Sequence, residues 1–158
     1  MTDYNIAATA ARMQGLHPLL RRLVAETGVS ILPDVEAHDA WAAHAGLAMA
    51  VYAEDPERYR ETLDLAVVVP ELHATAGRRF RVGLLLPEAA RALAPRYGFA
   101  RWPAFVMLRD GRYLGAVDGI RDWDVYIGEL ERLLAAEPAR PPSVGIAVRS
   151  EGSASSCH

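Results

Sequence analysis

The sequence predicts an α/β fold in which a central mixed β-sheet is flanked by helices on both faces. Helical and strand-like segments alternate through the middle of the chain, and helices that connect successive strands imply parallel pairing with right-handed crossovers. The Asp110-Gly111 pair between two strand-like segments predicts a hairpin, which adds an antiparallel part. Residues 47–53 are apolar throughout, as expected for a central strand buried on both sides.

The first half of the predicted domain alternates helix and strand. A helix over residues 16–27 has Pro18 in its first turn and Gly28 just past its end, the positions that these residue types favour. A short strand is expected at 29–32, and a second helix at 37–45 leads to the central strand.

A third helix is predicted at residues 62–76, although two local signals bear on its limits. Asp55 can cap a helix that has Pro56 in its first position. The β-branched run at residues 67–69 would favour a strand on propensity alone, and Pro70 interrupts either pattern.

The second half is expected to end in a hairpin covered by a terminal helix. A strand at 80–86 and a helix at 88–97 precede two hairpin strands at 104–109 and 112–117, and the last helix begins near Asp122, a natural cap. The residues expected to face the interior are Trp123, Ile127, Leu130 and Leu134 of this helix, together with Trp41.

The domain organisation follows from composition along the chain. A single domain is assigned to residues 16–136, preceded by an extension at 1–15 and followed by a Pro/Gly/Ser-rich tail at 137–158. Within the tail, the short apolar stretch at 144–148 could dock on the domain or on a partner.

Overall composition excludes several classes of function. The net charge of −3 argues against nucleic-acid binding, and the short run of Arg78, Arg79 and Arg81 is too small for such a footprint. No apolar run approaches the roughly 18 residues that span a bilayer, so no membrane insertion is expected. The first residues lack the pattern of a secretory signal, which favours the cytoplasm.

Cysteine and histidine usage predicts neither a disulfide nor a metal site. The single cysteine, Cys157, cannot form an internal disulfide or a CxxC pair. The five histidines show no metal-ligand spacing with one another or with Cys157. We therefore expect no cofactor and no bound metal.

The segment at residues 94–104 (APRYGFARWPA) resembles the part of thioredoxins that ends in their cis-proline. An apolar strand, a tight turn, a second strand, Gly119 and an amphipathic helix follow, as in thioredoxins, and the resemblance covers most of residues 29–136. It implies a thioredoxin-like fold with a cis peptide bond between Trp102 and Pro103.

The resemblance to thioredoxins also shows that the redox cysteines are missing from this sequence. Thioredoxins carry their two cysteines after the central strand, which corresponds here either to residues 56–59 or, counting back from Pro70, to residues 62–65. Neither stretch contains a cysteine. Because disulfide exchange needs a thiolate nucleophile, redox catalysis is excluded for both alignments.

A closer resemblance rests on six short segments: 55–56, 69–72, 101–103, 111–115, 119–123 and 141–147. Together they are similar to the hydrogenase expression/formation proteins of the HyaE/HupG type, which are cysteine-free and thioredoxin-like. The resemblance implies a chaperone for an uptake [NiFe] hydrogenase that binds the small-subunit precursor and its twin-arginine signal peptide before export.

A binding site can be suggested from residue types. Carboxylates pair with guanidinium groups, so acidic residues beside an apolar groove would suit a twin-arginine leader. Trp102, just before Pro103, is a suitable aromatic anchor at the lip of such a groove. The candidate partner-binding residues are Glu54, Asp55, Glu57, Asp64, Glu71, Glu88, Trp102 and Pro103.

Other interpretations remain open from the sequence. The acidic residues could form a solvated face, and Trp102 could belong to the core. The protein could be a redox-inactive adaptor for a different partner, or an enzyme that uses the acidic loop, although no histidine adjoins that loop in sequence. The oligomeric state is also open, a homodimer included.

Overall fold

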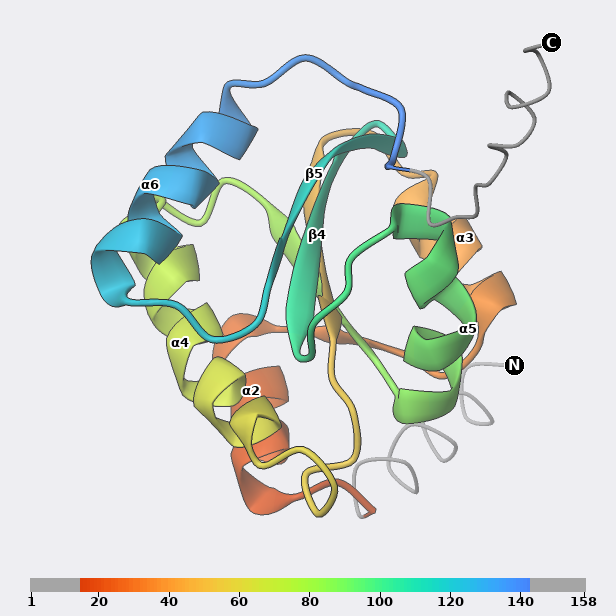
Figure 1. Cartoon of the computed structure of the whole chain (residues 1–158), viewed down its shortest axis with the longest axis vertical. Coiled ribbons are helices and arrows are strands. Elements are labelled where there is room, and N and C mark those ends of the chain that lie inside the picture. The colour runs from red at the N-terminus through yellow and green to blue at the C-terminus, as the bar shows by residue number, and fades with distance from the viewer. Residues whose placement is uncertain (1–14, 143–158) are drawn as a thin grey trace, which may run out of the picture.

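The computed structural model describes residues 15–142, and it confirms the predicted order of elements (Figure 1). The elements are α2 (Pro18–Thr27), β1 (Ser30–Leu32), α3 (Val35–Ala42), β2 (Leu47–Tyr52), α4 (Glu61–Thr75), β3 (Arg81–Leu85), α5 (Pro87–Tyr97), β4 (Ala104–Arg109), β5 (Arg112–Asp118) and α6 (Trp123–Leu134). The expectations for residues 1–14 and 143–158, including the apolar stretch at 144–148 and Cys157, lie outside the described residues.

The strands form a five-stranded mixed sheet in the order β1-β3-β2-β4-β5. β3 pairs in parallel with both β1 and β2, as their helical crossovers require, whereas β4 runs antiparallel to β2 and to β5. The central position of β2 explains its uniformly apolar sequence, because both of its faces are covered. The expected fold class is confirmed.

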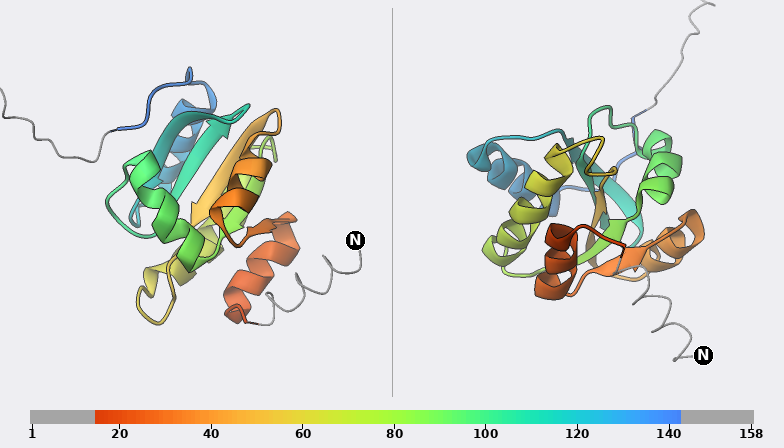
Figure 2. Two further views of the ribbon diagram at one scale, coloured as in Figure 1. Left: turned by 90° about the vertical axis from the view of Figure 1, so that its right-hand side faces the viewer. Right: turned by 90° about the horizontal axis from the view of Figure 1, so that it is seen from below.

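Helices cover both faces of the sheet, and each face has its own core. α2, α4 and α6 lie on one side, while α3 and α5 lie on the other (Figures 1 and 2). The alternation of side chains along β2 sends Met49 and Val51 to the first core and Ala48, Ala50 and Tyr52 to the second.

The start of α4 differs from the expectation. Asp55 does not cap this helix, because its carbonyl accepts the N–H groups of Arg58 and Tyr59 in a separate turn, and α4 begins only at Glu61. The β-branched run at residues 67–69 is helical, and Pro70 lies inside the helix. Tertiary packing thus outweighs the strand propensity of this run.

The predicted inner stripe of α6 is partly wrong. Trp123 is the first residue of the helix and is 43% exposed, whereas Tyr126, Leu130, Leu133 and Leu134 are buried. A residue at the first position of a helix projects beyond its end as readily as onto its inner face. Trp41, also expected in the core, is half-buried and packs against the second core.

The peptide bond between Trp102 and Pro103 is cis, as predicted.

Residues 137–142, assigned to a tail from the sequence, pack on the domain, because Ala139 donates its N–H to the Tyr113 carbonyl at 2.8 Å and Pro142 lies against Gly98. Within residues 15–142, no helix is both long and apolar enough to cross a membrane.

Candidate functional site

The candidate site surrounds the connection between β2 and α4, residues 53–60, at the carboxyl ends of β2 and β3. Crevices at the carboxyl ends of strands in open α/β sheets are common ligand sites. The cis-proline loop, residues 98–103, enters β4 from the same end of the sheet because β4 runs antiparallel to β2. The loops therefore meet at one edge, although they lie about 40 residues apart in sequence.

Glu54 is at the centre of this edge and is almost completely buried, with 4% exposure. Its carboxylate accepts two hydrogen bonds from the Arg91 guanidinium of α5, at 2.5 and 3.0 Å, and a third from the Asp55 N–H at 2.8 Å. The Arg91 hydrogen bond holds the pKa of Glu54 below its ordinary value, although burial opposes this. The charge of Glu54 is therefore already compensated within the protein.

Two further hydrogen bonds fix the shape of the connection. The Thr62 hydroxyl, buried in the first turn of α4, donates to the Glu54 carbonyl at 3.0 Å. The Asp55 carboxylate accepts the N–H of Glu57 at 3.0 Å. Each stretch that corresponds to the thioredoxin cysteines thus has one residue, Glu57 or Thr62, hydrogen-bonded to the start of the connection, and neither stretch contains a thiol.

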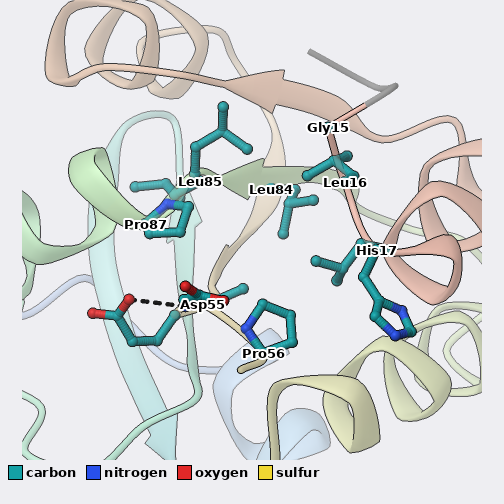
Figure 3. A pocket seen from close by; sticks show the side chains of 12 residues that line it. Gly15, Leu16, His17, Asp55, Pro56, Leu84, Leu85 and Pro87 are labelled. Atoms are coloured by element: carbon teal, nitrogen blue, oxygen red, sulfur yellow. Dashed lines mark hydrogen bonds between the residues drawn. The ribbon is translucent and has the colours of Figure 1, made fainter. Parts of the chain in front are cut away.

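A pocket of about 230 Å³ lies on one side of this connection (Figure 3). We call it the leucine pocket, after Leu16, Leu20, Leu84, Leu85 and Leu86. Asp55 and Pro56 form the wall across from Leu84 and Leu85 (Figure 3). Asp55 is half-buried and forms no ion pair within residues 15–142, so the pocket combines an apolar lining with one available carboxylate.

A more open groove of about 370 Å³ lies on the other side, and we call it the Trp102 groove. Trp102 meets Phe99 edge to face with ring centroids 5.3 Å apart, and Phe99 meets the buried ring of Tyr52 in the same way at 4.9 Å. The remaining lining includes Tyr59, Pro95 and the two arginines Arg58 and Arg91, with Glu54 beneath. Trp102, the aromatic residue that the sequence suggested for a groove, thus lines this one.

Asp118 supports the cis-proline loop and was missed from the sequence. Its carboxylate accepts the N–H groups of Ala100 and Arg101 at 2.9 and 3.1 Å and a hydrogen bond from Arg121 at 3.0 Å. Burial alone would raise the pKa of Asp118, but these hydrogen bonds outweigh it and the pKa is lowered. The only sequence signal for this role of Asp118 was the presence of an acidic residue at the end of a predicted strand.

The other acidic candidates do not form one rim. Glu57 is exposed beside Asp55, and Asp64 is exposed on the first turns of α4. Glu71 lines a hollow between α2 and α4, and Glu88 lines another beside the start of α3, and neither hollow shares a lining residue with the leucine pocket or the Trp102 groove. Of the six acidic candidates, only Glu54, Asp55 and Glu57 lie together, and Glu54 also lines the groove that contains Trp102.

This edge of the sheet can contact a ligand through several kinds of side chain. The described residues of the site include no cysteine. Among residues 15–142, no three histidine, cysteine, aspartate or glutamate side chains gather closely enough to hold a metal ion. What the site offers is an apolar pocket, an aromatic groove, and charges of both signs.

The chain is similar to known hydrogenase expression/formation proteins. The family model "Hydrogenase-1 expression protein HyaE" matches residues 19–126. The chain is 41% identical over 143 residues to a hydrogenase expression/formation protein, HoxO, of Cupriavidus necator, covering 89% of this chain and 88% of that protein. HoxO of Azotobacter vinelandii is 32% identical over 140 residues, covering 89% and 93% of the two chains.

A solved thioredoxin from Halobacterium salinarum superimposes with a TM-score of 0.55 at 21% identity, covering 69% of this chain and 93% of that one. At this identity the likeness concerns the fold alone, which is thioredoxin-like.

Proposed function

Because the chain belongs to the HyaE family of hydrogenase expression proteins, we propose that it is a redox-inactive cytoplasmic chaperone for an uptake [NiFe] hydrogenase. In this proposal it binds the small-subunit precursor through its twin-arginine signal peptide and catalyses no reaction. The family supports a role in hydrogenase maturation. The leucine pocket, with Asp55 in its wall, is the observation that carries the choice of ligand.

An apolar pocket with one available carboxylate suits a segment that is both apolar and cationic. An apolar leader side chain would fill the space between Leu16, Leu20 and Leu84, and a guanidinium group would reach Asp55 and the neighbouring Glu57. Exposed ion pairs contribute only about 0–1 kcal/mol each, so burial of apolar surface would supply most of the affinity. Glu54 has no part in this recognition, because Arg91 already binds its carboxylate.

The proposal is tested by calorimetric titration of the full chain with a peptide of the small-subunit leader. We expect binding that the double variant Asp55→Asn, Glu57→Gln weakens severalfold at low salt and less at high salt, because counterions screen exposed charges. The matched control, Asp124→Asn with Glu36→Gln, removes two exposed acids away from the pocket and should leave the affinity unchanged. Leu16→Ser should weaken binding at every salt concentration.

The alternative is a redox-inactive adaptor with a different protein partner. If neither the leader peptide nor the whole precursor binds the wild type, the chaperone proposal fails and the adaptor takes its place. If the leader binds but ignores both the acidic double variant and Leu16→Ser, the function stands and the leucine pocket is not its site. We also expect the protein not to accelerate insulin reduction by dithiothreitol. Acceleration that persists in Cys157→Ser would contradict the non-catalytic role.

A further inference from the structure

We propose that the Trp102 groove is a second binding site, specific for a peptide segment of a partner protein in which a carboxylate stands beside an aromatic side chain. This site adds to the proposed chaperone function, but its ligand has the opposite charge to the leader. The inference rests on the sign of the charge at the groove and on its aromatic wall.

The charge of the groove surface is positive. Arg58 and Arg91 both line it, and the one carboxylate there, Glu54, is buried beneath them and bound by Arg91. Arg58 is exposed and forms no hydrogen bond or ion pair through its side chain within residues 15–142. A carboxylate could pair with Arg58, whereas a guanidinium group would find no carboxylate in the lining other than Glu54, which Arg91 already binds.

The aromatic wall is packed onto the second core. Trp102 packs on Phe99, and Phe99 packs on Tyr52, which is fully buried in β2. Asp118 holds the two residues before Trp102 through their backbone N–H groups. An aromatic side chain from a partner would therefore meet a surface that is already ordered, which lowers the entropic cost of binding.

The two sites thus divide a partner by charge. Glu54 and the connection above it separate them, since Glu54 lines both the leucine pocket and the Trp102 groove. An arginine-rich apolar segment is expected on the Asp55 side, and an acidic aromatic segment on the Arg58 side.

Fluorescence anisotropy with three short labelled peptides tests this site. Each carries a phenylalanine flanked by two glutamates, two glutamines or two lysines. We expect the glutamate peptide to bind the full chain about tenfold more tightly than the lysine peptide at low salt, with the glutamine peptide between them. Arg58→Glu should abolish this order. Arg60→Glu, which makes the same charge change at an exposed residue outside the groove, should preserve it.

Trp102→Leu separates the aromatic contribution from the charge. It should weaken all three peptides and keep their order. The proposal is overturned if the three peptides bind equally, or if Arg60→Glu acts as strongly as Arg58→Glu. If this second site fails the test but the leader peptide still binds, the proposed chaperone function is unaffected. If the leader peptide does not bind but the three short peptides behave as expected, the second site is unaffected.

Discussion

The two faces of the sheet differ in how their buried polar side chains are satisfied. The first core, under α2, α4 and α6, is the larger, and its buried polar side chains have partners. Tyr126 donates its hydroxyl to the Gly119 carbonyl at 3.1 Å, Thr62 donates to the Glu54 carbonyl, and His73 is hydrogen-bonded to the Phe80 carbonyl. The core under α3 and α5 is smaller and contains His38 and Tyr52. The Tyr52 hydroxyl and the His38 Nε2 are both buried without a hydrogen-bond partner among the described residues.

The binding surfaces are related to the two cores in different ways. The Trp102 groove rests on Phe99 and Tyr52 of the second core, whereas the leucine pocket draws on both cores, through Leu20 and Leu84 of the first and Leu85 of the second. The following predictions test whether the two cores differ in energy as they do in the satisfaction of their buried polar groups.

The largest expected effect is in the first core. Phe105 is fully buried and packs near Tyr126, with ring centroids 6.2 Å apart. Phe105→Ala should lower the free energy of unfolding by about 3–5 kcal/mol, because it removes buried surface and leaves a cavity. Val67→Ala, at a position that is 57% exposed, is the control and should change stability by less than about 0.5 kcal/mol. Chemical denaturation measures both, and similar losses would contradict the assignment of the core.

A pH effect is expected from the second core. Burial lowers the pKa of His38, and this outweighs the hydrogen bond to the Asp39 carboxylate, while Arg96 adds a small effect in the same direction as burial. The folded protein thus binds a proton at His38 less readily than the unfolded chain, whose histidine titrates near pH 6.5. Stability should be level above about pH 6.5 and fall as the pH drops below it.

Urea denaturation between pH 8 and pH 5 measures this slope. His38→Leu should remove most of it, whereas His44→Gln, at an exposed histidine, should keep it. Equal slopes in the wild type and His38→Leu would assign the pH dependence to other groups.

A matched pair of tyrosine substitutions should have opposite signs. Tyr52→Phe removes a buried hydroxyl that has no partner among the described residues, so it should raise stability by about 1 kcal/mol. Tyr126→Phe removes a hydroxyl that donates to the Gly119 carbonyl, so it should lower stability by about 1 kcal/mol. Losses of the same size at both positions would show that the Tyr52 hydroxyl is as well satisfied as that of Tyr126.

Much of the fold could be predicted because its signals are local. The hairpin at Asp110-Gly111, the apolar central strand and the sequence before Pro103 each lie within a few residues of the feature that they predict. The exposure of Trp123 could not be predicted in the same way. Helical periodicity gives the face of a helix but not how far its first residue projects past the neighbouring elements.

The candidate site was harder to predict because its contacts are distant in sequence. Glu54 was expected to face a partner, but Arg91, 37 positions away, binds it inside the protein. Nothing in the sequence marks this pairing, since it depends on how α5 packs against β2 in the fold. The same applies to Asp118, which supports Ala100 and Arg101 from 17–18 residues away.

The central claim is that the two sides of Glu54 bind segments of opposite charge. Amide chemical-shift mapping of the isotope-labelled full chain with two probes, the leader peptide and the glutamate-flanked phenylalanine peptide, tests it most directly. We predict that the leader shifts amides of Leu16, Leu20, Asp55 and Leu84, and that the acidic peptide shifts those of Arg58 and Trp102. Shifts of the same amides by both probes, or shifts confined to the opposite end of the sheet, would contradict the claim.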